Sequence, residues 1–111
     1  MNGRLELWLF VAQRASAAVL APLVLVHLAT MIAVVQGGLS AAEILSRTQG
    51  SPWWTAFYGL FVVAAAVHGA IGLRTIVGEM TPLKGVGASI AAGAFALAVL
   101  ALGLRAVAAL T

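Results

Sequence analysis

The sequence contains no cysteine and few charged residues: Asp, Glu, Lys and Arg together make up only 8% of its 111 residues. The absence of cysteine excludes disulfides, thiolate zinc sites and iron-sulfur clusters bound by this chain. Soluble proteins carry roughly 25% charged residues, so this chain lacks the polar side chains needed to cover a water-facing surface. Its six Lys and Arg residues are scattered and form no basic stripe, which argues against nucleic acid as a partner.

What the chain has instead is apolar sequence, with 63% hydrophobic residues. Three runs, residues 15–35, 53–73 and 88–110, reach the roughly 20 residues that a helix needs to cross about 30 Å of hydrocarbon. A helix satisfies all its backbone groups internally, which lipid demands. We therefore predict an all-α integral membrane protein, with three transmembrane helices in a single domain over residues 1–111. We expect it to form part of a larger helical bundle and to contact membrane lipid.

The remaining segments are more polar. Residues 1–14 mix apolar and charged side chains, which favours a segment lying at the membrane interface. Residues 39–50 are expected to form the loop between the first two spans on the outer side. Ser40 and Glu43 have the spacing of a capping box, so a short helix is expected in this loop.

The basic residues predict an orientation. With the N-terminus inside, the cytoplasmic side carries Arg4, Arg14, Arg74 and Lys84, and the outer side carries Arg47 and Arg105. The positive-inside rule favours this arrangement. We expect a multi-pass protein of the bacterial inner (cytoplasmic) membrane with a cytoplasmic N-terminus.

Two histidines, His27 and His68, lie well inside the first and second spans. Ionisable residues are costly at this depth and are usually functional. Imidazole is a good axial ligand for haem iron, so both histidines are candidate metal ligands. The alternative is that each imidazole only forms a hydrogen bond to a neighbouring helix.

The residues around His68 have small side chains or none: Ala64, Gly69 and Gly72 lie on or beside its face of the helix. A flat macrocycle fits against such a face, and so does a second helix in close contact. Arg74 lies six residues further on, where its guanidinium is placed either to bind a haem propionate or to mark the membrane edge.

The two histidines are predicted to lie at different depths. Relative to Arg14 and Arg74 at the inner boundary, His27 lies about 20 Å and His68 about 9 Å into the membrane, at 1.5 Å per residue. One iron needs both ligand nitrogens within about 2 Å. If both histidines bind haem, each therefore needs an opposing ligand from another subunit.

Arg14 and Ser16 open the first span, where a cation and a hydroxyl are suited to bind a quinone carbonyl. The alternative is an anchoring arginine and a serine bonded to its own backbone. Tyr58 is interpreted as an interfacial residue.

Residues 68–79, HGAIGLRTIVGE, resemble the second-helix motif H-x3-G-x-R-x4-D of the membrane anchor subunits of succinate dehydrogenase and fumarate reductase, with Glu79 replacing the Asp. Residues 13–17, QRASA, are similar to the H-R-x-S-G at the start of the first helix in the same family. Gln13 replaces the His of this motif, Ala17 replaces the Gly, and Phe10 replaces a Ser that the family often has four residues before the Arg.

The resemblance implies a subunit that holds a flavoprotein subunit and an iron-sulfur subunit on the membrane and passes electrons between the iron-sulfur subunit and quinone. It implies that His68 is a haem b ligand and that Arg14 lies at the quinone site. A first-helix histidine like His27 occurs in the five-helix, two-haem anchors of this family. The chain therefore resembles half of such an anchor, with one or two b haems shared with a second anchor subunit or a second copy of this chain.

Two alternatives come from other classes of protein. One is a haem-free structural anchor, and the other is a cytochrome b subunit of a different membrane-bound dehydrogenase, such as one for formate or hydrogen. The sequence contains no Ser-His-Asp set, no phosphate loop and no carboxylate pair within a span, so we expect no independent catalytic activity.

Overall fold

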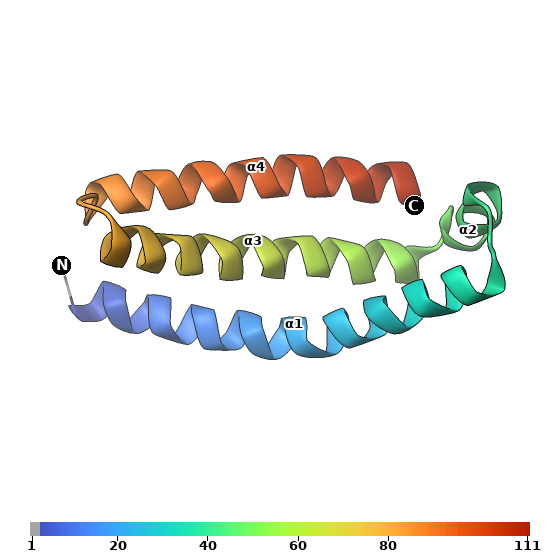
Figure 1. Cartoon of the computed structure of the whole chain (residues 1–111), viewed down its shortest axis with the longest axis horizontal. Helices are drawn as coiled ribbons and strands as arrows, with labels where there is room; N and C mark the ends of the chain where they lie inside the picture. The colour runs from blue at the N-terminus through green and yellow to red at the C-terminus, as the bar shows by residue number, and fades with distance from the viewer. Residues whose placement is uncertain (1–2) are drawn as a thin grey trace.

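The computed structural model describes residues 3–111 and has four helices. They are α1 (Gly3–Gly37), α2 (Ala41–Thr48), α3 (Pro52–Met80) and α4 (Val86–Leu110), shown in Figure 1. The three longer helices are each long and apolar enough to cross a membrane, and the described residues contain no strand. The predicted all-α fold with three membrane-spanning helices is confirmed.

The first helix is longer than predicted. It begins at Gly3 and contains 35 residues, so it extends for about 52 Å, more than the roughly 30 Å of the hydrocarbon core. The expected separate segment over residues 1–14 is therefore not found: residues 3–14 continue directly into the span, and Met1 and Asn2 lie outside the described residues. The reason is local, since residues 4–14 contain neither Gly nor Pro and are rich in good helix formers.

The short helix α2 closes the end of the molecule opposite the N-terminus. Ser40 caps it, with its side chain accepting from the backbone N–H of Glu43 while the Glu43 carboxylate accepts from the backbone N–H of Ser40. At its other end the buried Thr48 hydroxyl donates to the carbonyl of Leu110 at 2.8 Å. These bonds hold α2 against the C-terminal end of α4. We call this the α2 end, and the opposite one the N-terminal end.

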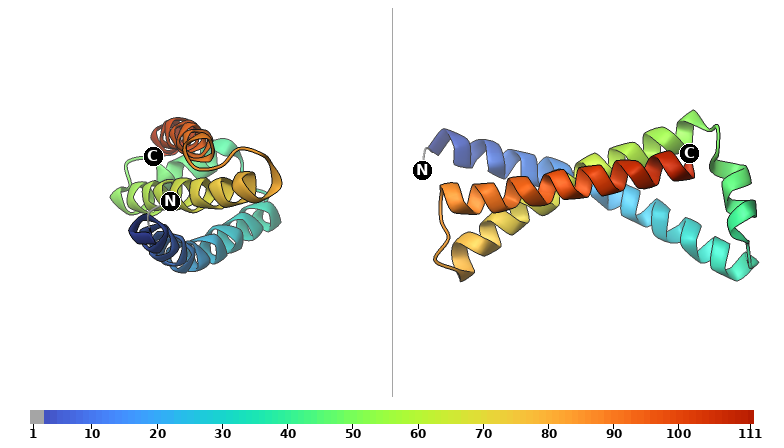
Figure 2. Two further views of the ribbon diagram at one scale, coloured as in Figure 1. Left: turned by 90° about the vertical axis from the view of Figure 1, so that its left-hand side faces the viewer. Right: turned by 90° about the horizontal axis from the view of Figure 1, so that it is seen from above.

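The three long helices form layers, with α3 in the middle and α1 and α4 on its two sides. Figure 2 shows that α1 and α3 cross near their middles and diverge toward their ends. In Figure 1, α1 is also bowed, and Pro22 lies within it, where its ring removes one backbone hydrogen bond.

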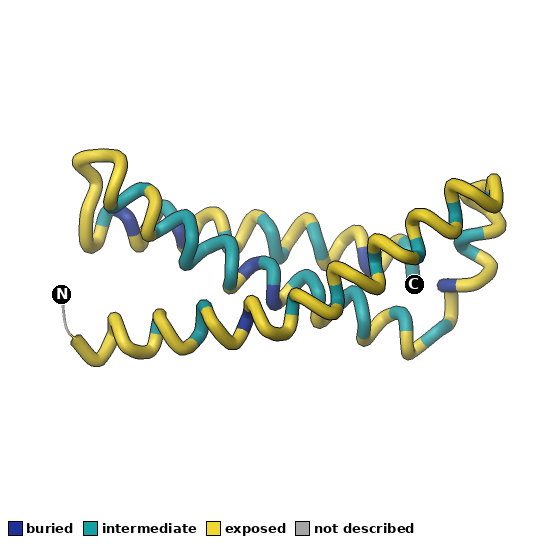
Figure 3. Tube along the Cα trace, turned by 60° about the horizontal axis from the view of Figure 1, so that its bottom comes forward, coloured by how far each residue is buried: buried dark blue, intermediate teal, exposed yellow. Residues whose placement is uncertain are grey.

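Few residues are buried within the chain. The buried apolar residues are Ala64, Ala66, Ala88, Ala92 and Val107, and α1 buries only Ser16. Figure 3 shows that most of the surface of α1 is exposed along its length. The exposed side chains are largely apolar, so this surface suits lipid or further helices rather than water.

Candidate functional site at the crossing of α1 and α3

His68 lies where α1 and α3 cross, and its closest polar neighbour is Ser16 of α1. The Nδ1 atom of its half-buried imidazole is 3.3 Å from the Ser16 Oγ. Ser16 is buried, with 6% of its surface exposed, and its hydroxyl donates to the backbone carbonyl of Gln13 at 3.0 Å. The structure thus brings together two of the predicted site residues.

His27 lies at a second contact between the same helices. Its Nδ1 atom is 3.4 Å from the hydroxyl oxygen of Tyr58 on α3. The rings of Tyr58 and Phe61 meet the imidazole edge-on, with centroids 5.7 and 5.5 Å away. This histidine is therefore held mainly by aromatic side chains.

The two imidazoles lie at different levels of the crossing. Because α1 and α3 are antiparallel, His27 lies opposite Tyr58 and Phe61, whereas His68 lies opposite Ser16. These positions are 7 to 11 residues apart along either helix, which corresponds to about 10–16 Å at 1.5 Å per residue. Two nitrogens that must each approach one iron within about 2 Å cannot do so from such positions.

The side chains around His68 suit a ligand to haem iron. Ser16 occupies the Nδ1 side of the ring, and Nε2 has no hydrogen-bond partner among residues 3–111. Histidine ligands characteristically bind the metal through one nitrogen while the other is held by a hydrogen bond. Among the same residues no group of three or more His, Cys, Asp or Glu side chains forms a site for a bare metal ion. The donor set fits axial ligation of haem.

The small residues beside His68 serve helix packing within this chain. A Cβ atom on Gly69 would lie 2.9 Å from the Phe95 ring of α4, and one on Gly72 would lie 3.6 Å from the Gln13 amide of α1. Ala64 is buried. Of the two interpretations of this small face, the structure therefore favours close approach of helices.

Arg74 connects all three long helices near the N-terminal end. Its guanidinium is 3.4 Å from the Glu6 carboxylate of α1, and its Nε–H donates to the Ser89 hydroxyl of α4 at 3.1 Å. The side chain is mostly buried, with 15% exposed. Both partners belong to this chain, which the sequence pattern did not predict.

Arg14 and Ser16 do not come together. They are two positions apart on one helix and so point in nearly opposite directions. Ser16 faces α3, whereas Arg14 is exposed, with its guanidinium carbon 5.8 Å from the centre of the Phe10 ring. Arg14 is thus on the surface and Ser16 in the helix contact.

Sequence reasoning missed three residues of this region: Tyr58 beside His27, Gln13 beside Ser16, and Glu6 beside Arg74. The missing information was the register of α1 against α3. Once one pair of contacting residues in two antiparallel helices is known, the other contacting pairs follow by counting in opposite directions along the two helices. The Oε1 atom of Gln13 is buried without a hydrogen-bond partner among the described residues.

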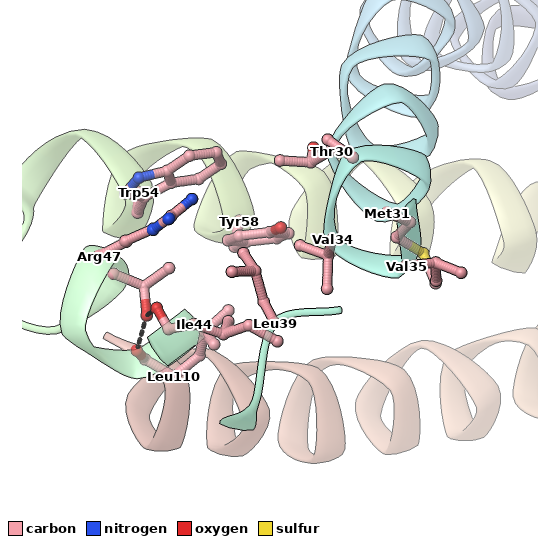
Figure 4. Close-up of a pocket in the computed structure, with 12 residues that line it drawn as sticks. Thr30, Met31, Val34, Val35, Leu39, Ile44, Arg47, Trp54, Tyr58 and Leu110 are labelled. Atoms are coloured by element: carbon pink, nitrogen blue, oxygen red, sulfur yellow. Dashed lines mark hydrogen bonds between the residues drawn. The ribbon is translucent and has the colours of Figure 1, made fainter. Parts of the chain in front are cut away.

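The α2 end contains a pocket with a volume of about 360 Å³ (Figure 4). Tyr58, which contacts His27, forms part of its wall, together with Arg47 and Trp54. None of the lining residues is a carboxylate or an imidazole. A smaller pocket, of about 230 Å³, lies beside Arg74 and Ser89.

Comparison with known proteins identifies a family for this chain. The model of the succinate dehydrogenase/fumarate reductase transmembrane subunit family matches residues 1–110 of the chain. A search of the curated proteins and a search of the solved structures give no match.

Proposed function

This chain belongs to the succinate dehydrogenase/fumarate reductase transmembrane subunit family, and we propose that it binds haem b and passes electrons between the iron-sulfur subunit and quinone. Membership makes it a multi-pass membrane subunit that associates with the other subunits of such a complex. Membership favours such a complex over a membrane-bound dehydrogenase for formate or hydrogen. The partners that we propose are a flavoprotein subunit and an iron-sulfur subunit.

The observation that supports haem binding most strongly is the environment of His68. The imidazole lies within a span, one nitrogen contacts a buried hydroxyl, and the other has no partner among the described residues. Haem b would supply a one-electron centre within the membrane at this site. His68 would hold it as an axial ligand, and Ser16 and α1 would hold the imidazole in place.

His27 is proposed as the ligand of a second haem. Its separation of about 10–16 Å from His68 along the helices excludes a shared iron. Each histidine therefore needs an opposing ligand from outside the chain, supplied by a second anchor subunit or a second copy of this chain. The exposed apolar surface of α1 leaves room for the helices of such a partner.

The quinone site is proposed at Arg14, whose exposed guanidinium is available to donate hydrogen bonds to a quinone carbonyl. Ser16, the second predicted member of this site, faces the opposite way. Arg74, the predicted partner of a haem propionate, is bonded to Glu6 and Ser89, so any propionate there would share the guanidinium with them.

The proposed orientation places the N-terminal end of the molecule in the cytoplasm. Figure 1 shows the N-terminus and the turn between α3 and α4 at this same end. The basic residues of this end are Arg4, Arg14, Arg74 and Lys84, so the positive-inside rule supports a cytoplasmic N-terminus in the bacterial inner membrane.

A second candidate function is a haem-free structural anchor. It is favoured by the fact that both imidazoles have partners within this chain, since His68 contacts Ser16 and His27 contacts Tyr58. Interhelical hydrogen bonds of this kind stabilise membrane bundles by roughly 0.6 kcal/mol each.

The test is to purify the intact complex from membranes through an affinity tag on this chain. We expect mass spectrometry to identify a flavoprotein and an iron-sulfur subunit, and a reduced-minus-oxidised spectrum to show the bands of a b-type haem. A complex with all its subunits but without porphyrin absorbance would instead establish the structural anchor.

A further inference from the structure

The Ser16 hydroxyl has only one proton, and its oxygen lies 3.0 Å from the backbone carbonyl oxygen of Gln13. Ser16 Oγ donates to the Gln13 carbonyl oxygen, which cannot itself donate. While this bond is formed, the Ser16 oxygen can only accept a hydrogen bond from any other neighbour. Ser16 is buried, so its hydroxyl has little access to water or lipid headgroups.

The neighbour on the other side of that oxygen is His68 Nδ1, at 3.3 Å. While Ser16 donates to Gln13, a hydrogen bond between Ser16 and His68 requires the proton to be on Nδ1. A neutral imidazole carries a single N–H, so Nε2 is then unprotonated and presents a lone pair. A neutral nitrogen with a lone pair is the form of imidazole that binds a metal.

We propose that Ser16 is a positioning residue that holds His68 in the Nδ1–H tautomer, so that Nε2 is the atom presented to iron. This inference rests on the proposed function, in which His68 is a haem ligand. Ser16 then supports the haem ligand and is not part of the quinone site, to which its position in the sequence had assigned it. Ser16 still belongs to the electron-transfer machinery, but it acts through His68.

His27 provides an internal comparison. Its Nδ1 atom faces the Tyr58 hydroxyl, and Tyr58 has no other hydrogen-bond partner among residues 3–111. That hydroxyl is able either to donate to Nδ1 or to accept from it, so the contact does not select one tautomer. The two histidines of this chain therefore differ in how their protons are held.

The tautomer can be measured without haem, and the sequence makes this simple because the chain has only two histidines. The full chain is labelled with 15N-histidine, reconstituted in lipid without haem, and studied by NMR, in which protonated and unprotonated ring nitrogens have different shifts. We expect His68 to carry its proton on Nδ1. In Ser16→Ala we expect a mixture of tautomers at His68, and in Ser16→Thr, which keeps the hydroxyl, the Nδ1–H form.

Two controls accompany these variants. Ser46→Ala removes an exposed hydroxyl from α2 and is expected to leave both histidine signals unchanged. Tyr58→Phe is expected to change the signal of His27 alone. An Nε2–H tautomer at His68, or an unchanged tautomer in Ser16→Ala, would overturn the inference.

A second measurement uses the intact complex. A hydrogen bond to the distal ring nitrogen makes a histidine ligand more electron-donating, and its loss typically weakens metal binding by 10–100-fold. We expect Ser16→Ala to weaken haem retention roughly 10-fold and to raise the midpoint potential of the haem, because the ferric form loses more stabilisation. An unchanged potential with the haem still bound would contradict the inference. The absence of haem from the wild-type complex would overturn the proposed function, while the NMR result would still test the tautomer.

Discussion

Gly103 of α4 lies directly against Val62 of α3. A Cβ atom at position 103 would be 2.6 Å from the Val62 Cγ1 atom, closer than real side chains tolerate. Val62 is branched at Cβ and has little freedom to rotate away. The close approach of these two helices therefore depends on the absence of a side chain at position 103.

Gly103→Ala is expected to destabilise the chain by about 1–3 kcal/mol, the usual cost of overpacking. Val62→Ala introduced together with it should recover much of this loss, because it removes the atoms that the new methyl group meets. The measurement is SDS-induced unfolding in mixed micelles. Gly93→Ala is the matched control, since no atom lies within 4 Å of its would-be Cβ. Equal losses of stability in Gly103→Ala and Gly93→Ala would show that the contact between Gly103 and Val62 is unimportant.

Arg74 is expected to contribute more to the stability of the folded chain than Glu6 does. Glu6→Gln removes the ion pair with Arg74, in which the Glu6 side chain is 51% exposed. Exposed ion pairs contribute no more than about 1 kcal/mol to stability. Arg74→Met keeps an apolar stem but removes the bonds to both Glu6 and Ser89, so we expect a clearly larger loss in the same unfolding assay. A loss in Glu6→Gln as large as that in Arg74→Met would contradict this assignment.

The capping box of α2 predicts a dependence on pH. The pKa of Glu43 lies below its ordinary value of 4.5, mainly because the backbone N–H of Ser40 donates to its carboxylate, with the Ser40 side chain second. A carboxyl whose pKa is lowered in the folded state stabilises that state at pH values above the pKa of the same carboxyl in the unfolded chain. This contribution is lost as the pH falls through the lowered pKa.

We therefore expect the amide protons of α2 to lose protection from hydrogen exchange below about pH 4.5, beyond the intrinsic change in exchange rate. Glu43→Gln keeps a side chain able to accept the Ser40 N–H but does not titrate, so its protection should be independent of pH in this range. The same acid dependence in wild type and Glu43→Gln would assign the effect to another group.

The sequence predicted those features that depend on composition and local spacing. Hydropathy alone located the three spans, because lipid requires long apolar helices. The spacing of Ser40 and Glu43 predicted the α2 cap. The sequence did not predict that α1 begins at Gly3, because the charged residues among positions 1–14 suggested a boundary, whereas nothing in residues 4–14 ends a helix.

The candidate site was harder to predict because it depends on how α1 and α3 are aligned. The sequence placed His27 and His68 inside their spans and at different depths, since depth follows from counting residues. It gave no sign that Ser16 faces His68 while Arg14 faces outward, because hydropathy does not determine how a helix is rotated about its axis. The partners of Arg74 depend on the same rotation.

The central claim is that His68 binds haem iron, and the most direct test is to count haem in the intact complex of the His68→Gln variant. Glutamine keeps a polar side chain of similar length with an amide donor and acceptor, but it does not replace imidazole as an iron ligand. We predict that haem b, assayed as pyridine haemochrome per iron-sulfur subunit, falls by one for each copy of this chain while the subunits remain assembled. A fully assembled His68→Gln complex with the haem content of the wild type would contradict the account.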